Sequence, residues 1–123
     1  MQTQKSGKNY PKRGEIFIAD LDPAYGREIH KKRPVLIISN DNINQIYQIV
    51  ISVPFSSIIP EFIGPDVVKF LDQKGLDKRS ALIVNQMRSI DKDRLIKKIG
   101  KVSKVHMREV EEALKIVLGF LEL

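Results

Sequence analysis

The segment from Arg27 to Pro34 concentrates positive charge in a short stretch of the chain. Its ionisable residues are Arg27, Glu28, His30, Lys31, Lys32 and Arg33. Arg33 directly precedes Pro34, and a residue before proline is restricted to extended backbone. Its planar guanidinium can hold two phosphate oxygens at once, which an ammonium cannot. We therefore expect Arg33 to bind an anionic ligand, whereas solvation is the simpler interpretation of Lys31 and Lys32.

Two further segments place polar side chains in or beside apolar stretches. Ser56 and Ser57 follow an apolar strand candidate, where hydroxyls either take part in chemistry or cap a turn. Asn85 and Gln86 are adjacent within apolar residues 80–87, so in a strand they would point to opposite faces. At least one amide then needs hydrogen-bond partners, either a base edge in a groove or groups of the protein itself. Both interpretations stay open for each segment.

Several kinds of site are missing from the sequence. There is no Walker-type glycine loop, no GxGxxG and no HExxH motif. The absence of cysteine excludes disulfides, thiolate metal sites and cysteine nucleophiles. His30 and His106 are far apart in the sequence, so no histidine-based metal site is expected. We expect neither a metal nor a cofactor.

These candidate residues need a scaffold, which the sequence predicts to be mostly strands. Strands are predicted over 15–20, 34–39, 47–54, 66–70 and 80–87, with loops over 24–32 and 55–65, a turn over 40–44, and a helical turn over 91–97. Pro54 is expected at a strand end or edge, because it has no N–H to donate. Apolar residues at three- and four-residue spacing over 107–121 predict an amphipathic helix, with Ser103 as its N-cap. The expected fold is α+β and mainly β, a small antiparallel barrel covered by this helix.

Length and composition set the outer limits. The 123 residues, 42% of them hydrophobic, fit a single domain over 14–123 that follows a disordered basic tail over 1–13. The net charge is +6, but the 17 basic and 15 acidic residues outside that tail nearly balance, so global charge is weak evidence for nucleic acid. No apolar run approaches the roughly 20 residues of a membrane helix, and no signal peptide is visible. We expect a cytoplasmic protein with no membrane partner.

Four segments, in order and with similar spacing, resemble the MazF/PemK family of toxin–antitoxin ribonucleases. They are residues 13–23 (RGEIFIADLDP), residues 26–38 around the basic segment, residues 53–57 (VPFSS) and residues 85–91 (NQMRSID). The resemblance runs from about Arg13 to the C-terminal helix. It implies an SH3-like barrel, usually a homodimer, that cuts single-stranded RNA without a metal. It also implies a cognate antitoxin that occludes the RNA groove.

The resemblance also implies roles for individual residues. The catalytic arginine falls on Arg33, and the catalytic hydroxyl falls on Ser56, where the family usually has threonine. Asn85 stands where some members carry a carboxylate, and an amide cannot accept a proton at neutral pH, so the general base is unassigned. The residues expected to bind RNA are Arg27, Glu28, His30, Lys31, Lys32, Ser57, Asn85, Gln86 and Arg88.

The implied reaction is transfer of the phosphodiester to the RNA's own 2′-hydroxyl, which leaves a 2′,3′-cyclic phosphate and a 5′-hydroxyl. Two other functions stay open. The first is a non-catalytic RNA-binding module. The second is a gyrase-directed toxin of the CcdB type, which the resemblance disfavours because those proteins end in a Trp-Gly-Ile tail and this sequence has no tryptophan. An RNA-cleavage assay decides between the ribonuclease and the RNA-binding module, and a gyrase supercoiling assay tests the gyrase-directed toxin.

Overall fold

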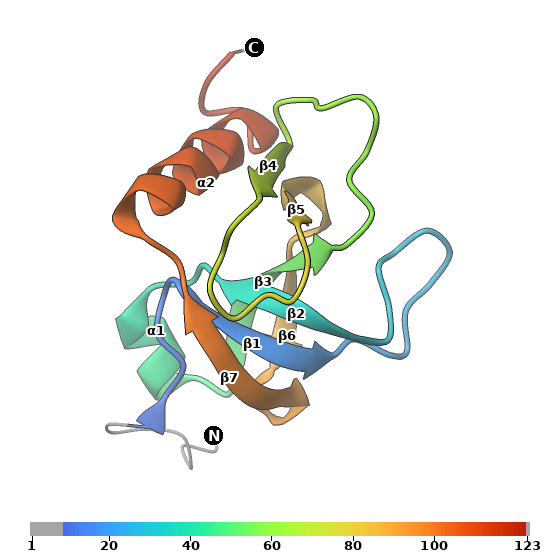
Figure 1. Cartoon of the computed structure of the whole chain (residues 1–123). Coiled ribbons are helices and arrows are strands. Elements are labelled where there is room, and N and C mark those ends of the chain that lie inside the picture. Colours follow the sequence, from blue (N-terminus) through green and yellow to red (C-terminus); the bar gives the residue numbers. More distant parts are fainter. Residues whose placement is uncertain (1–8, 123) are drawn as a thin grey trace.

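The computed structural model describes residues 9–122 and contains one antiparallel sheet of seven strands with two α-helices (Figure 1). The strands pair in the order β4-β5-β3-β2-β1-β7, and β6 pairs with β3. The elements are β1 (Glu15–Asp20), β2 (Lys32–Ile37), α1 (Asp41–Ile46), β3 (Ile49–Ser56), β4 (Val67–Phe70), β5 (Ser80–Ile83), the 3-10 turn η2 (Val84–Gln86), β6 (Arg88–Asp91), the 3-10 turn η3 (Lys92–Arg94), β7 (Leu95–Lys101) and α2 (Lys104–Val117).

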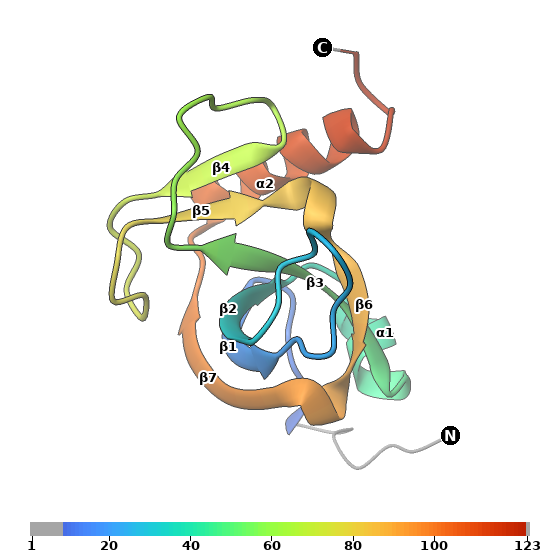
Figure 2. The same cartoon turned by 90° about the vertical axis from the view of Figure 1, so that its right-hand side faces the viewer.

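The long strand β3 belongs to two parts of the sheet. Its first residues, Ile49 to Ser52, pair with β6, whereas Phe55 and Ser56 pair with β5. Figure 2 shows β7, β1, β2, β3 and β6 curling around a common centre, so that the two edge strands meet where η3 joins them. The hairpin of β4 and β5 extends from the other end of β3 and lies beside α2. The α+β fold with an antiparallel barrel and a C-terminal helix is therefore confirmed.

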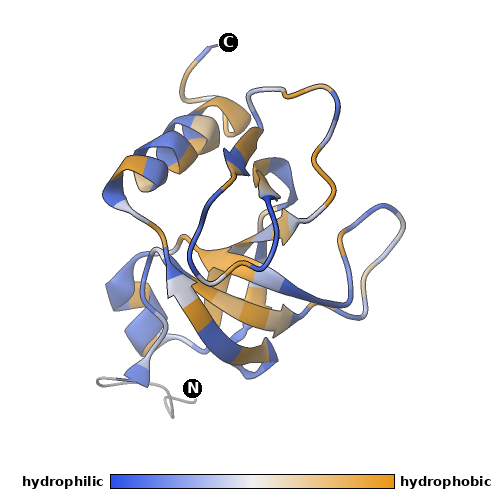
Figure 3. Ribbon diagram, viewed as in Figure 1, coloured by the Kyte–Doolittle hydropathy of each residue, from blue (hydrophilic) through white to orange (hydrophobic). Residues whose placement is uncertain are grey.

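Apolar side chains fill both faces of the central strands. One core cluster lies between the sheet and α2 and includes Ile16, Leu36 and Phe55, while the other lies inside the curl and includes Val35 and Ile37. Both faces of β2 are thus covered, which explains why its apolar residues run without alternation. Figure 3 shows the same concentration of hydrophobic residues in the middle of the sheet, with the long loop between β1 and β2 largely hydrophilic.

Two local predictions were wrong, and a third was right only in part. Residues 40–44 do not form a turn but begin α1, because the Asn40 side chain accepts a hydrogen bond from the Ile43 amide and caps the helix. The strand predicted over 80–87 ends at Ile83, where the chain enters η2. The helical turn expected over residues 91–97 is present as η3, but it ends at Arg94 where β7 begins, and β6 was not predicted.

Pro54 lies inside β3 rather than at its end, opposite Val35 of β2. The proline is tolerated because the β3 residues that pair with β6 and β5 leave a gap at Val53 and Pro54, so no ladder bond on that side needs its missing N–H. The strand therefore continues to Ser56. The predicted helix α2 is confirmed with Ser103 as its N-cap, although it ends at Val117, and Gly119 follows with a φ of 83°.

Part of the expected N-terminal tail is packed against the domain. Residues 1–8 lie outside the described residues, but Pro11 is buried and Arg13 makes several contacts. The Arg13 Nε donates to the carbonyl oxygen of Ile38 at 3.1 Å, and its guanidinium lies 3.0 Å from the Glu111 carboxylate of α2. Within residues 9–122, no helix is long and apolar enough to cross a bilayer.

Candidate active site

The two predicted catalytic residues lie at the same end of neighbouring strands. Arg33 is the second residue of β2 and Ser56 is the last residue of β3. The two strands are antiparallel and their pairing runs from Ile37 with Ser52 to Val35 with Pro54, so Arg33 and Ser56 each lie two residues beyond the last pair. Alternation along each strand places Arg33 on the face of β2 that carries Val35, and Ser56 on the face of β3 that carries Pro54. Both residues thus follow the same end of the β2–β3 ladder, where Arg33 pairs with Ala19 of β1 and Ser56 with Ala81 of β5.

The backbone and the Nε atom of Arg33 are held by hydrogen bonds, whereas its two terminal nitrogens are available to a ligand. Its backbone pairs with Ala19 of β1, and its Nε donates to the carbonyl oxygen of His30 at 2.8 Å. No described carboxylate lies within ion-pair distance of the guanidinium. The bond to His30 leaves the terminal nitrogens, which can present two N–H groups to one anion. Arg33 is thus a positioned cation without a counter-ion among the described residues.

The Ser56 hydroxyl closes a tight turn at the end of β3. Its Oγ accepts a hydrogen bond from the Ile58 amide at 3.1 Å and donates to the Ile58 carbonyl oxygen, also at 3.1 Å. The turn-capping interpretation of this hydroxyl is therefore correct. It does not conflict with a chemical role, because a hydroxyl proton rotates to whichever acceptor is stronger. A phosphate oxygen beside Oγ would be such an acceptor, while the Ile58 amide would keep Oγ in place.

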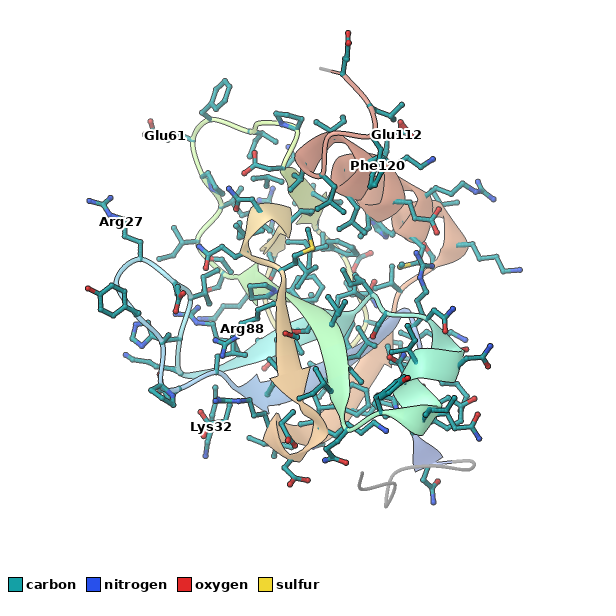
Figure 4. The ribbon with its side chains drawn as sticks, turned by 180° about the vertical axis from the view of Figure 1, so that it is seen from behind. Arg27, Lys32, Glu61, Arg88, Glu112 and Phe120 are labelled. Atoms are coloured by element: carbon teal, nitrogen blue, oxygen red, sulfur yellow. The ribbon has the colours of Figure 1, made fainter. Side chains whose placement is uncertain are left out.

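The loop between β1 and β2 carries the cationic segment and is held by its own acidic residues. The Glu28 carboxylate accepts from the Tyr25 amide at 2.7 Å, and the Asp22 carboxylate accepts from the Lys31 amide at 3.0 Å. The same Asp22 carboxylate lies 3.6 Å from His30 Nδ1. Asp22 and Glu28 thus use their carboxylates to hold the conformation of the loop. Figure 4 shows Arg27 pointing outward from this loop and Lys32 pointing outward where β2 begins.

Gln86 fastens the loop to the rest of the domain. Its Oε1 accepts from the Ile29 amide at 2.7 Å, and its Nε2 lies 3.5 Å from the carbonyl oxygen of Arg27. The structural interpretation of this amide is therefore correct, although its partners lie 57 and 59 residues away in the sequence. Asn85 is exposed, and no side-chain hydrogen bond joins it to another described residue. Because both amides sit in η2, they do not point to opposite faces of a strand as expected.

One pocket gathers five of the residues that were expected to bind RNA. It has a volume of about 490 Å³ and lies between the β1–β2 loop and η2, and it also adjoins Pro54 of β3. Arg88 lies against the domain near the base of the loop (Figure 4), where its Nη1 donates to the Leu21 carbonyl oxygen at 3.2 Å. We call the pocket of about 490 Å³ the loop pocket. The residues lining it that were expected to bind RNA are Arg27, Glu28, Asn85, Gln86 and Arg88.

A second pocket, of about 730 Å³, lies between the loop over residues 71–79 and strands β1, β2 and β7. Three predicted residues line it, namely Lys32, Arg33 and Ser57, whereas His30, Lys31 and Ser56 line neither pocket. The sequence did not indicate the other cations that line this pocket, Lys78, Lys97 and Lys98. Lys97 and Lys98 reach it only through the pairing of β7 in the sheet, and Lys78 only through the position of the loop over residues 71–79. We call this the β7 pocket.

Two glycines hold the wall of the β7 pocket against the sheet. A Cβ atom on Gly75 would overlap the carbonyl oxygen of Ile99, and one on Gly100 would lie 2.7 Å from the carbonyl oxygen of Lys74. Gly75 also has a φ of 98°, which side-chain-bearing residues rarely adopt. The loop over residues 71–79 and strand β7 therefore meet backbone to backbone. Among residues 9–122, no three His, Cys, Asp or Glu side chains group closely enough to hold a metal ion.

Comparison with known proteins identifies the family to which this chain is similar. Residues 12–118 match the family of PemK-like, MazF-like toxins of type II toxin–antitoxin systems. The chain is 38% identical over 109 residues to the endoribonuclease MazF of Staphylococcus saprophyticus, covering 88% of this chain and 91% of that protein.

Solved structures have the same fold at lower sequence identity. A crystal structure of MazF from Deinococcus radiodurans superposes with a TM-score of 0.80 at 22% identity, covering 89% of this chain and 97% of the other. A mycobacterial endoribonuclease in complex with its cognate antitoxin superposes with a TM-score of 0.76 at 23% identity, covering 92% of this chain and 99% of the other. The chain therefore belongs to the family of PemK-like, MazF-like toxins of type II toxin–antitoxin systems.

Proposed function

We propose that this protein is an endoribonuclease that cuts single-stranded RNA at specific sequences, without a metal, as the toxin of a type II toxin–antitoxin module. The observation that carries the proposal is the position of Arg33 and Ser56 at the same end of the neighbouring strands β2 and β3, each two residues beyond the last pair. The family and the 38% identical endoribonuclease support the enzyme class. The cationic β1–β2 loop supports a polyanionic substrate.

The proposed reaction needs little chemistry from the protein. The RNA 2′-oxygen attacks the adjacent phosphorus, the bond from phosphorus to the 5′-oxygen breaks, and a 2′,3′-cyclic phosphate and a 5′-hydroxyl result. The 2′-hydroxyl loses its proton and the departing 5′-oxygen gains one. Because nucleophile and phosphorus belong to one molecule, the substrate itself supplies their proximity. The protein must chiefly stabilise the charge that builds on the phosphoryl oxygens.

Arg33 and Ser56 suit that task. The Arg33 guanidinium, held through Nε by the His30 carbonyl oxygen, offers its remaining N–H groups to the non-bridging oxygens. The Ser56 O–H turns from the Ile58 carbonyl oxygen toward the same phosphate. One well-aimed donor is typically worth about 10²–10³ in rate. Glu28 is the only carboxylate lining the loop pocket, but its bond to the Tyr25 amide serves the loop, so the general base stays unassigned.

The remaining RNA contacts follow from the two pockets. We propose that Arg27, Asn85 and Arg88 bind the strand in the loop pocket, while Lys32 and Ser57 bind it on the other side of Arg33. Gln86 and Glu28 act by shaping the loop, and His30 and Lys31 contribute charge near its base. We further propose a homodimer, a cytoplasmic location and a cognate antitoxin as the inhibitory partner. A mycobacterial relative in complex with its own antitoxin supports the last point.

The test is to incubate the purified protein with a long RNA and to map the ends of the fragments. The expected products carry 2′,3′-cyclic phosphate and 5′-hydroxyl ends at a short recurring sequence. The Arg33→Ala variant should fold and lose detectable cleavage. A folded Arg33→Ala variant that cuts at the wild-type rate would show that the assignment is wrong, and a wild-type protein that binds RNA without cutting it would establish a binding module instead.

A further inference from the structure

The β7 pocket carries more positive charge than the proposed cleavage chemistry uses. Lys78 comes from the loop over residues 71–79 and Lys97 from the edge strand β7, and both side chains are exposed. No described carboxylate lies within ion-pair distance of either ammonium group. Lys98 differs, since its Nζ lies 2.7 Å from the Glu15 carboxylate. Asp77 is the only acidic residue that lines the pocket, so its rim stays cationic.

The floor of the pocket is apolar and built from three strands in register. Lys97 is opposite Ile18, and Ile18 is opposite Pro34, so this row runs from β7 across β1 to β2. Ile99 and Leu76 add apolar surface beside the row. All four apolar side chains are partly exposed. Apolar side chains beside cationic ones in one pocket match a nucleotide, whose base has an apolar face and whose phosphates are anionic.

Irregular pairing of β7 explains how consecutive lysines reach this rim. Phe17 pairs with Lys98 and Ile16 with Gly100, so Ile99 is an extra residue on the β7 side. A second shift between Ile18 and Ala19 leaves Ile96 unopposed in the same way. Such bulges redirect side chains that would otherwise alternate between the faces of a strand. Lys97, Lys98 and Ile99 consequently all line the pocket, although they are adjacent in the sequence.

We propose that the β7 pocket binds a nucleotide of the RNA that flanks the cleaved bond, with Lys78 and Lys97 contacting its phosphates. The inference takes its ligand from the proposed function and adds a path for the strand beyond the reactive phosphate. Arg33 joins the two sites, because it lines the pocket and is also the cation proposed to hold the reactive phosphate. One RNA strand held at Arg33 therefore reaches Lys78 and Lys97 without a second ligand. An acidic polypeptide would meet the same charges, but it would leave the apolar side chains that line the pocket unexplained.

The experiment measures affinity for single-stranded RNA that carries 2′-deoxy substitutions at the mapped cut site and so cannot be cleaved. The double variant Lys78→Ala/Lys97→Ala is compared with Lys104→Ala/Lys115→Ala, which removes the same charge from exposed positions of α2. Each phosphate contact on a single strand contributes about 0.7 to the slope of log affinity against log salt. The pocket variant should therefore lower the slope by about 1.4 and weaken binding by about tenfold or more near 0.1 M salt. The α2 variant should stay within about twofold of wild type.

Further measurements separate this inference from the proposed function. RNA trimmed from one end, until it no longer reaches the pocket, should bind wild type and pocket variant equally well. If wild type cuts RNA while the pocket variant matches the α2 variant in affinity and salt slope, this inference fails and the proposed function stands.

Two other outcomes are equally decisive. If wild type binds RNA with the lysine-dependent slope but cuts none, cleavage is wrong and the binding path holds. If the pocket variant keeps its RNA affinity but loses binding to polyglutamate, the pocket serves an acidic protein and the inference is overturned. Thermal unfolding of both variants at the wild-type temperature confirms that the comparison concerns folded proteins.

Discussion

Replacing Gln86 by alanine should loosen the β1–β2 loop without unfolding the domain. The Gln86 Oε1 is the acceptor for the Ile29 amide at 2.7 Å, whereas its second contact, to the Arg27 carbonyl oxygen, is long at 3.5 Å. We therefore assign nearly all of the effect to one hydrogen bond. Such a bond contributes about 0.5–1.5 kcal/mol, and a buried donor left without a partner costs about 1–3 kcal/mol.

The magnitude follows from the position of Ile29, which is half-buried, so that water can replace part of the lost bond. We expect local opening of the loop to become easier by about 1–1.5 kcal/mol, which is roughly a 5- to 12-fold rise in the opening equilibrium. Native-state hydrogen exchange reads this directly at the Ile29 amide. Amides of the central strand, such as that of Leu36, should keep their protection. Under the proposed function, KM for RNA rises and kcat changes less.

The adjacent residue supplies a matched control. Asn85→Ala removes a neighbouring amide that has no side-chain hydrogen bond to a described residue, so exchange at Ile29 should stay at the wild-type rate. Gln86→Glu keeps an acceptor oxygen for the Ile29 amide and should restore most of the protection. Unchanged exchange at Ile29 in Gln86→Ala, or an equal increase in Asn85→Ala, would refute the assignment of Gln86 as the fastener of this loop.

Three further predictions concern the reaction and its pH limits. Ser56→Ala should lower kcat by about 10²–10³ with little change in RNA affinity, measured by single-turnover cleavage and binding of uncleavable RNA; an equal loss of affinity at unchanged kcat would make Ser56 a binding residue. Cleavage should survive excess EDTA, and a loss restored by Mg²⁺ would reject the metal-free reaction. The Asp93 amide and the Gln48 side chain donate hydrogen bonds to the Asp91 carboxylate, and with nearby Arg94 they lower the pKa of Asp91. The stability that the ionised carboxylate contributes is therefore complete above the pKa of an unfolded aspartate, and it is lost as the pH falls through the lower pKa of the folded state. Urea unfolding between pH 7 and pH 3 should accordingly show a weaker acid dependence for Asp91→Asn than for wild type, and identical slopes would contradict this role.

Sequence reasoning succeeded where local pattern and tertiary structure agree. The apolar spacing and the Ser103 cap identify α2, and the strand formers from Glu15 to Asp20 identify β1. It failed where distant contacts decide the conformation. Gln86 was placed in a strand because its neighbours are apolar, whereas η2 turns there so that its amide meets the β1–β2 loop. The residues of β6 are too few and too polar to signal a strand without β3 beside them.

The same division applies to the candidate site. Arg33 stood out locally, because it precedes Pro34 within a cationic segment. Its position at the same end of the β2–β3 ladder as Ser56 could not be read from composition, since it depends on how the two strands pair, and the family resemblance supplied the link between the two residues. Lys78 and Lys97 gave no signal at all. They are ordinary surface lysines in the sequence, and only the docking of the loop over residues 71–79 on β7 makes them neighbours of Arg33.

The backbone contact between Gly75 and Gly100 has a consequence for how such proteins diverge. Because main-chain atoms set the gap between loop and strand, the width of the β7 pocket does not depend on which side chains line its rim. Single substitutions at Lys78 or Lys97 can then retune affinity for neighbouring nucleotides while the frame keeps its dimensions. A change of width, in contrast, needs coordinated replacement of two glycines. We therefore expect related proteins to differ more often in the charge of the residues that line this pocket than in its width.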